Sequence, residues 1–221
     1  MKKEIIIIGL SNNAKLAAYY FSRDTDFKVL GFAVHSQYKS TEVFYNLPVY
    51  DIENIQNLFP PSEVFAFVAV GYNDMNDIRK NLYQSMKEMG YILPNYISSK
   101  CSFLTEEPIG DNNFILEDNT IQPFVKIGSN NVFWSGNHIG HDVIIGDHNF
   151  ITSHVVVSGF TKINNNCFIG VNATLRDGIE IADKTLIAAA AVIMKNTNIG
   201  DVYLPARTVL SDKKSTELKI S

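Results

Sequence analysis

The chain has 221 residues, of which 46% are hydrophobic and 19% are charged, and its formal net charge at pH 7 is -4. This length predicts one large domain or two small ones. The mild acidity and the lack of a basic run argue against nucleic acid or an anionic membrane as the main partner. The apolar run Ile5–Ile8 is too short to span a bilayer, and two cysteines are too few for a disulfide scaffold. We therefore expect a cytoplasmic protein that binds neither membranes nor nucleic acids.

The first third of the chain alternates predicted strands with predicted helices. The segments "EIIII", "FKVLGFAV" and "VFAFVAV" are rich in apolar and β-branched residues and predict strands, with helices from about Ala14 and after Gly71. This order predicts a small Rossmann-like parallel sheet of βαβ units over residues 1–93. Ligands of such sheets collect at the carboxyl ends of the strands, where helix N-termini offer free N–H groups to phosphate.

Two loops at those strand ends are candidate nucleotide-binding segments, "GLSNN" from Gly9 and "GYND" from Gly71. Neither has the GxGxxG pattern, so a dinucleotide site is not expected. A simpler interpretation is that the two glycines merely turn the chain. The candidate substrate-binding residues of these loops are Ser11, Asn12, Asn13, Gly71 and Asn73.

A six-residue period dominates the rest of the chain. From Ile97 to Ile199 every sixth residue is apolar, without an insertion. Helices repeat near 3.6 residues and strands at 2, so neither explains this period. A short fixed period marks a solenoid, in which each unit buries its apolar face by stacking on its neighbours. We predict a hexapeptide parallel β-helix of triangular coils over residues 94–204, with 205–221 as a tail and Cys101 and Cys167 in small inward positions.

Histidines mark one part of this repeat. His141 lies two residues past the anchor Ile139 and should sit near a corner on the outer surface. The adjacent Asp142 can fix the tautomer of the imidazole, and histidine is the natural general base near neutral pH. His138 is a further candidate for positioning substrate, whereas His148 and His154 are expected at the surface or at an interface. The histidine spacings lack a carboxylate or cysteine set in register, so no metal site is expected.

The segment "IGHDVIIGD" and the later "INNNCFIGVNATLRDGIEIADKTLIAAAAVIMKNT", behind a small βαβ domain, resemble the left-handed β-helix (hexapeptide-repeat) sugar acyltransferases of the PglD/NeuD-like family. The resemblance covers nearly the whole chain. It implies a homotrimer with acetyl-CoA in a groove between adjacent β-helices and a nucleotide-linked sugar on the N-terminal domain. It also implies that His141 is the general base, that Asp142 polarises it, and that backbone N–H groups stabilise a tetrahedral oxyanion.

The resemblance assigns further residues. Gly159, eighteen residues after His141, should lie above the base and leave room for pantetheine. His35 stands near a place where relatives carry an acidic residue, and Phe150 replaces a second histidine. Relatives have glycine-rich loops where this chain has "GLSNNAK", so Asn12 and Asn13 would make the turn. The other candidate cofactor-binding residues are Ala189 and Ala190, where relatives often carry glycines, and Pro205 and Arg207, near the adenine end.

We predict an acyltransferase that moves an acetyl group from acetyl-CoA to the amino group of a nucleotide-linked sugar. Acetylation of a sugar hydroxyl, transfer of a larger acyl group and a non-catalytic trimeric scaffold are alternatives. The sequence leaves the nucleotide, the sugar and the role of the tail open.

Overall fold

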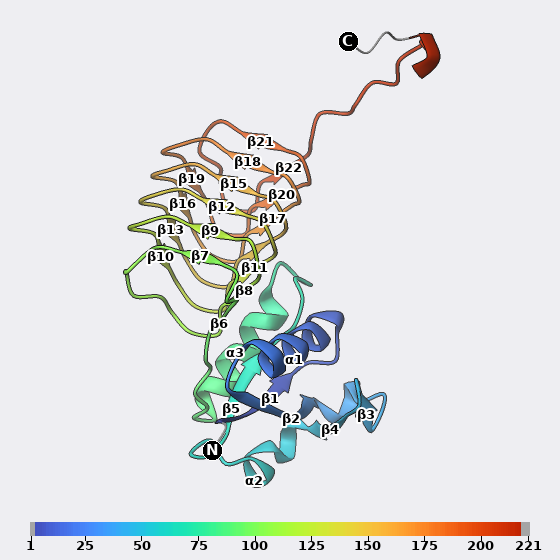
Figure 1. Ribbon diagram of the computed structural model, residues 1–221, viewed down its shortest axis with the longest axis vertical. Coiled ribbons are helices and arrows are strands. Elements are labelled where there is room, and N and C mark those ends of the chain that lie inside the picture. Colours follow the sequence, from blue (N-terminus) through green and yellow to red (C-terminus); the bar gives the residue numbers. More distant parts are fainter. Residues whose placement is uncertain (1–2, 218–221) are drawn as a thin grey trace.

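The computed structural model describes residues 3–217, and its elements form two groups that follow one another along the chain (Figure 1). The first group contains a five-stranded sheet with the order β3-β4-β2-β1-β5, parallel except for the pair β3 and β4. Its elements are β1 (Lys3–Ile8), α1 (Asn12–Asp24), β2 (Phe27–Val34), η1 (Ser36–Tyr38), β3 (Val43–Phe44), β4 (Leu47–Asp51), η2 (Ile52–Asn54), α2 (Ile55–Leu58), β5 (Phe65–Val68) and α3 (Asp77–Glu88).

Strand β1 is buried on both faces. Ile5 and Ile7 join the core that includes α1, and Ile6 and Ile8 join a second core with residues of α2 and α3. A strand covered on both faces reads as a continuous apolar run, which explains the four isoleucines. The first helix, predicted from about Ala14, begins two residues earlier, at Asn12. The turn is made before the helix, where Gly9 has a φ of 130° that favours glycine.

The second group is the predicted left-handed parallel β-helix. Its strands have two residues each, and paired residues are eighteen apart, as in Ile127 with Ile145 and Ile139 with Val157. The strands are β6 (Tyr96–Ile97), β7 (Ser102–Phe103), β8 (Phe114–Ile115), β9 (Thr120–Ile121), β10 (Lys126–Ile127), β11 (Val132–Phe133), β12 (His138–Ile139), β13 (Ile144–Ile145), β14 (Phe150–Ile151), β15 (Val156–Val157), β16 (Lys162–Ile163), β17 (Phe168–Ile169), β18 (Thr174–Leu175), β19 (Glu180–Ile181), β20 (Leu186–Ile187), β21 (Val192–Ile193) and β22 (Val202–Tyr203).

These strands form the three sides of a prism. Side 1 contains β6, β8, β11, β14, β17, β20 and β22; side 2 contains β7, β9, β12, β15, β18 and β21; side 3 contains β10, β13, β16 and β19. The anchors of all three sides meet in one central core, in which Cys167 is fully buried and Cys101 partly buried. We name the corners by the sides that they join, so the 2–3 corner follows side 2 along the chain.

The last coil departs from the prediction. Ile199, the final anchor of the ladder, is 76% exposed. Val202 pairs with Leu186, sixteen residues earlier instead of eighteen. The buried hydroxyl of Thr197 accepts a hydrogen bond from the Ala182 N–H, so threonine takes the inward place. The coil is therefore two residues shorter, and the isoleucine of the repeat is turned outward.

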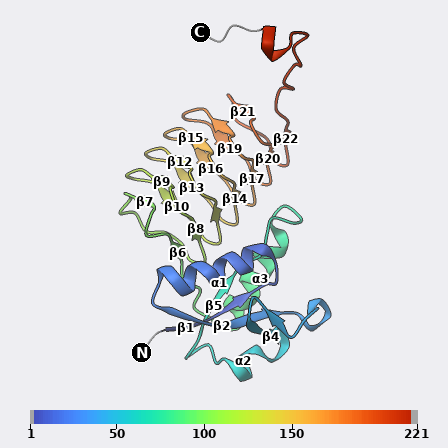
Figure 2. The same cartoon turned by 45° about the vertical axis from the view of Figure 1, so that its right-hand side comes forward.

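The α/β region covers side 1 of the prism from β6 to β17, whereas Val202 of β22 is exposed (Figure 2). The outward side chains of side 1 are mostly aromatic, and Tyr96 and Phe114 pack against Tyr20 of α1. Phe150, which stands where relatives carry a histidine, is also buried there. Helix α3 docks at the 3–1 corner through Arg79. Beyond β22 the chain runs out from the coils as an exposed segment that includes η3 (Ser215–Glu217) (Figure 1). Within residues 3–217, no helix combines the length and apolar character that crossing a bilayer requires.

Candidate active site

His141 and Asp142 form the 2–3 corner between β12 and β13. The imidazole Nδ1 lies 2.9 Å from a carboxylate oxygen of Asp142, and both side chains are about half exposed. Because a carboxylate can only accept hydrogen bonds, a neutral His141 donates through Nδ1 and carries its lone pair on Nε2. Asp142 has a φ of 57°, a left-handed conformation that aspartate tolerates. The corner thus presents an oriented base to solvent.

Three neighbours surround this imidazole. The His141 N–H donates to the side-chain oxygen of Gln122 at 2.8 Å. Gly159 lies over the ring, as the eighteen-residue register predicts, because a Cβ at this glycine would be 3.0 Å from both Cε1 and Nε2. The ring of Phe160 meets the imidazole edge to face, with 4.9 Å between the ring centres. The sequence prediction missed Phe160, although the register that pointed to Gly159 also places Phe160 above Asp142.

The remaining candidate residues on the β-helix are spread over other parts of it. His138 is exposed on the outer face of side 2, three residues before His141. Ala189 and Ala190 are exposed at the 1–2 corner, so side 2 separates them from His141. Pro205 and Arg207 follow β22 and are exposed. Within one protomer the structure therefore does not bring Ala189, Ala190, Pro205 and Arg207 to the imidazole.

A cavity of about 700 Å³ lies at the carboxyl ends of the parallel strands. Of the candidate substrate-binding residues, Ser11, His35 and Asn73 line it, whereas Asn12, Asn13 and Gly71 are not among its lining residues. The side chain of Asn13 instead lies beside Gly71, 3.3 Å from where a Cβ of that glycine would be. Further polar lining residues that the sequence prediction missed are Gln37, Tyr38, Asn81 and Ser85.

His35 is held at the mouth of this cavity by Glu53. The imidazole Nδ1 is 2.9 Å from a carboxylate oxygen of Glu53, which also accepts the Ser36 N–H. The hydrogen bond from His35 is the main cause that lowers the pKa of the Glu53 carboxyl. Glu53 comes from η2, eighteen residues after His35. Nothing in the local sequence pattern indicates this pairing, because it depends on how β2 and η2 meet in space.

Helix α3 stands between the cavity and the β-helix. Arg79 and Tyr83 face the β-helix and bond to its 3–1 corner. Asn81, Leu82 and Ser85 line the cavity. At 100° per residue these two sets lie on different faces of the helix, with Asn81 and Ser85 turned farthest from Arg79 and Tyr83. A ligand in the cavity is consequently on the far side of α3 from the β-helix of its own protomer.

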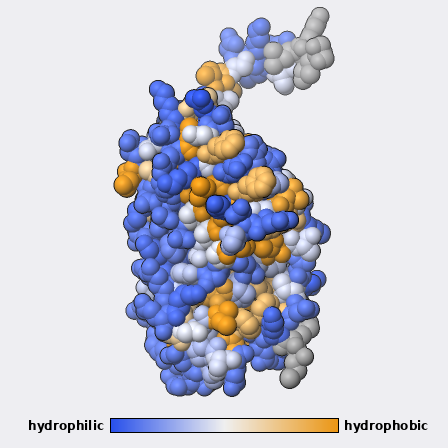
Figure 3. Space-filling view, turned by 90° about the vertical axis from the view of Figure 1, so that its left-hand side faces the viewer, coloured by the Kyte–Doolittle hydropathy of each residue, from blue (hydrophilic) through white to orange (hydrophobic). Residues whose placement is uncertain are grey.

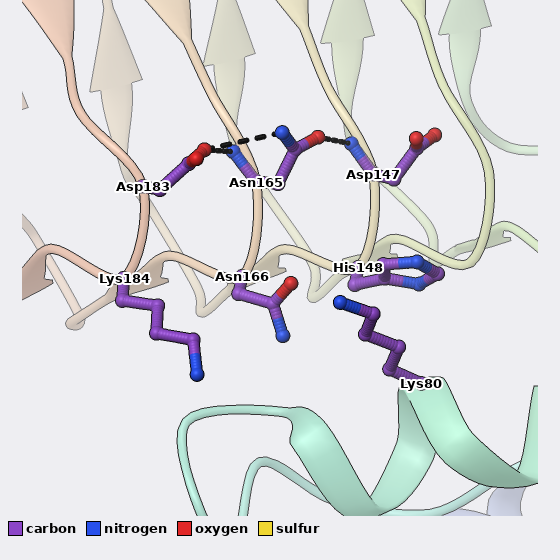
Figure 4. A pocket seen from close by; sticks show the side chains of 7 residues that line it. All are labelled: Lys80, Asp147, His148, Asn165, Asn166, Asp183 and Lys184. Atoms are coloured by element: carbon purple, nitrogen blue, oxygen red, sulfur yellow. Dashed lines mark hydrogen bonds between the residues drawn. The ribbon is translucent and has the colours of Figure 1, made fainter. Parts of the chain in front are cut away.

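A second, polar pocket of about 280 Å³ lies between α3 and the 3–1 corner (Figure 4). Asp147, Asn165 and Asp183 follow one another on successive coils, and the Asp147 N–H donates to the side-chain oxygen of Asn165, whose own N–H donates to the carboxylate of Asp183. Lys80 extends toward them from α3. His148, expected at the surface or at an interface, is instead buried between the two regions of the chain. Its Nδ1 accepts from the side-chain amide of Asn130, and burial lowers its pKa to about 4.

This pocket offers no cluster of metal ligands. Among residues 3–217, no group of three or more histidine, cysteine, aspartate or glutamate side chains is arranged to hold a metal ion. The pocket carries lysines and aspartates in equal number, and Lys184 is paired with Asp77 at 2.7 Å. His154, the other histidine expected at the surface, is exposed at the 1–2 corner, where its ring lies over Gly136.

Comparison with known proteins agrees with this architecture. Residues 125–159 match the family model "Bacterial transferase hexapeptide (six repeats)". The acetyltransferase domain of PglB from Neisseria gonorrhoeae is 19% identical, with a TM-score of 0.81 over 90% of this chain and 95% of that one. A structure of the same domain with acetyl coenzyme A gives 20% identity and a TM-score of 0.79, over 91% and 96% of the two chains.

PerB from Caulobacter crescentus, solved with CoA and GDP-perosamine, is 20% identical, with a TM-score of 0.77 over 91% of both chains. Among curated proteins, an acyl-[acyl-carrier-protein]–UDP-N-acetylglucosamine O-acyltransferase from Psychrobacter is 34% identical over 84 residues. This match spans 38% of the present chain and 27% of that protein. The chain thus contains hexapeptide repeats and has the two-part fold of these acetyltransferases.

Proposed function

We propose that this chain is an acetyl-CoA-dependent N-acetyltransferase that acts on a nucleotide-linked amino sugar. The observation that carries the proposal is the exposed pair of His141 and Asp142, which leaves the Nε2 lone pair beside the open face of Gly159. The bound ligands of the solved relatives support it, because one holds acetyl coenzyme A and another holds CoA with GDP-perosamine.

In this proposal His141 acts as the general base. Nε2 takes a proton from the sugar amine while the nitrogen attacks the thioester carbonyl carbon, and the carbonyl electrons move onto oxygen. When the tetrahedral intermediate collapses, the carbon–sulfur bond breaks and the imidazolium returns its proton to the departing sulfur. Asp142 keeps Nδ1 protonated and stabilises the positive charge that the ring acquires between the two steps.

The nucleotide of the substrate would occupy the 700 Å³ cavity beside α3. Ser11, His35 and Asn73 would contact it directly, with Asn12, Asn13 and Gly71 shaping the loops behind them. His138 would face the sugar. Gly159, Ala189, Ala190, Pro205 and Arg207 would lie along the acetyl-CoA groove between protomers. The cytoplasm is the compartment that suits this reaction, because it supplies both acetyl-CoA and nucleotide-linked sugars.

The position of α3 supports an assembly in which protomers share the site, which we take to be the homotrimer that the resemblance implies. This helix shields the cavity from its own β-helix, and the 2–3 corner is the vertex opposite the covered side 1. We infer that the cavity of one protomer faces the His141 of another. Apolar side chains gather on the β-helix flank in Figure 3. Exposed apolar side chains also lie on the two sides that meet at this corner, Ile144 on side 3 and Val156 and Val192 on side 2, which suits contact between protomers.

Acylation of a sugar hydroxyl is the second candidate. The curated relative from Psychrobacter is an O-acyltransferase with a UDP-linked sugar in its name, and the same base would serve a hydroxyl acceptor. The two candidates differ in the atom that receives the acyl group.

The test is acetyl transfer by the purified protein to a panel of UDP-, dTDP- and GDP-linked amino sugars and their hydroxyl analogues. Thiol release from acetyl-CoA is followed, and the product is treated with hydroxylamine, which cleaves esters but spares amides. We expect thiol release with at least one amino sugar, and we expect the acetylated product to resist hydroxylamine. A cleaved product would assign O-acetylation, and no release with any acceptor would favour a non-catalytic scaffold.

A further inference from the structure

The 2–3 corner carries aromatic residues where the backbone disfavours them. Its second position in four successive coils is Phe124, Asp142, Phe160 and Gly178, with φ values of 67°, 57°, 59° and 65°. Aspartate and glycine tolerate this left-handed region, but a bulky side chain is strained there. At the equivalent position of the 3–1 corner three of five residues are asparagine and none is phenylalanine: Asn112, Asn130, His148, Asn166 and Lys184. Folding alone therefore does not explain the phenylalanines.

Burial does not explain them either. Phe124 and Phe160 are each 62% exposed, so most of each ring gains nothing from leaving water. Strained and exposed residues persist where function requires them, and both of these flank the corner that holds His141.

Phe160 contacts the base directly. Its ring stands at 88° to the imidazole of His141 with 4.9 Å between the ring centres, and its N–H donates to the His141 carbonyl at 3.1 Å. Gly159 leaves the face near Cε1 and Nε2 open, while Phe160 supports the ring from another side. Within the described residues, Phe124 makes no aromatic contact with His141.

We propose that Phe160 is a positioning residue for the base, an inference that rests on the proposed function. A half-exposed imidazole held by one hydrogen bond can swing away from Asp142, because water competes for both partners. Edge-to-face packing against Phe160 restricts this rotation, so Nδ1 stays on the carboxylate and Nε2 stays beside the space above Gly159. The strain at Phe160 is then the cost of holding the ring in its reactive orientation.

The test compares Phe160→Asn with its matched control Phe124→Asn. Asparagine suits the left-handed backbone, so neither substitution should lower the thermal midpoint. Phe160→Asn should lower kcat about 10- to 100-fold, the usual effect of a misplaced catalytic group, with the KM for acetyl-CoA unchanged. Phe124→Asn should keep kcat near the wild-type value, and Phe160→Tyr, which retains the ring, should restore it.

A second readout does not need turnover. In protein with ¹⁵N-labelled histidine, the nitrogen shifts of His141, assigned with a His141→Ala variant, report which nitrogen is protonated. We expect protonated Nδ1 in the wild type and in Phe124→Asn, but a mixture of tautomers in Phe160→Asn. Unchanged shifts and kcat in Phe160→Asn, a lowered midpoint in it, or equal kcat losses in both variants would overturn the positioning role. If even the wild-type protein transfers no acetyl group, the proposed function fails, and the nitrogen shifts still decide the role of Phe160.

Discussion

At the scale of residues, the corner explains how neighbouring side chains come to work together. Successive side chains of a strand point to opposite faces, so residues i and i+1 do not normally meet. The left-handed φ of 57° at Asp142 turns its carboxylate back toward His141, which brings Nδ1 to 2.9 Å from the carboxylate oxygen. The pair therefore depends on the corner as much as on the two residue types.

Asp142→Asn tests this pairing. Asparagine keeps the size and the left-handed backbone, but its amide group can donate to Nδ1, so the tautomer with the lone pair on Nε2 is no longer selected. We expect kcat to fall by at least 10- to 100-fold, the effect typical of residues that orient a catalytic or metal-bound histidine, with little change in the KM for either substrate. Asp118→Asn, at an exposed corner with a φ of 60°, should leave kcat unchanged.

Sequence reasoning reached part of this site. The period of eighteen is enough to place Gly159 over His141, because stacking is a property of the backbone. The same period places Phe160 beside the base, but an apolar corner residue carries no sign that it touches a histidine. Ala189 and Ala190, which the resemblance assigns to acetyl-CoA binding, lie at a different corner from His141.

At the scale of elements, α3 holds the two regions of the chain together through Arg79. The guanidinium is fully buried, and its N–H groups donate to the carbonyls of Gly71, Asn130, His148 and Asn149 and to the side chain of Asn76. No carboxylate pairs with it among the described residues, and burial lowers its pKa. In the sequence it lies in "NDIRKNLYQ", where it cannot be told from a surface charge.

Arg79→Met should destabilise the protein strongly. The substitution leaves several buried carbonyl oxygens without donors, and losing one partner of a buried polar network costs about 3 kcal/mol or more. For a chain of this size we expect the thermal midpoint to fall by about 6–12 °C. Arg23→Met, which removes an arginine that lies over an exposed tyrosine ring on α1, should change the midpoint little. Equal midpoints for the two variants would show that Arg79 does not hold α3 to the β-helix.

The buried His148 predicts a dependence of stability on pH. Its pKa is about 4 in the folded protein, below the usual value near 6.5 of an unfolded chain. Between these values the unfolded chain binds more protons, so the free energy of unfolding decreases as the pH falls. From pH 7 to pH 5 this group should remove about 2 kcal/mol.

Urea unfolding at several pH values measures this contribution. His148→Asn, which suits the φ of 62°, should lose this part of the slope, whereas His154→Asn, at an exposed corner with a φ of 57°, should keep it. A slope that is the same in wild type and His148→Asn would mean that His148 is not buried in its neutral form.

The six-residue period does not predict the last coil of the β-helix. The repeat placed Ile199 in the core, yet the last coil is two residues shorter and turns this side chain outward. A coil in the middle of the stack must match two neighbours, whereas the last coil has a neighbour on one side only. The register of the last coil is therefore less constrained, and an apolar residue at the six-residue period is no longer necessarily buried there.

At the scale of the whole molecule, the prism separates the cavity from the base. Side 1 is covered by the α/β region, and the 2–3 corner is the opposite vertex. The six-residue repeat could not predict that the α/β region covers side 1. The outward residues that make this contact, such as Phe114 and Phe168, lie outside the pattern of apolar anchors. This arrangement supports our proposal that the site is built from two protomers.

Mixed trimers test the shared site. Asn81→Trp places a large side chain in the cavity from an exposed helix position, and His141→Ala removes the base, so each variant alone should be inactive. In co-expressed mixtures, an intact cavity of one protomer meets an intact His141 of another. Random assortment predicts roughly a quarter of wild-type activity. Mixtures as inactive as their parents would place the whole site within one protomer.

The most direct measurement is the rate of acetyl transfer by His141→Ala beside His154→Ala, which removes an exposed imidazole from another corner. With the amino sugar that the wild-type protein accepts, we predict that His141→Ala lowers kcat by about 10²–10⁴, the usual contribution of a general base. The affinity for acetyl-CoA should stay the same, and His154→Ala should turn over at the wild-type rate. A His141→Ala enzyme that transfers acetyl groups as fast as the wild type would contradict the account.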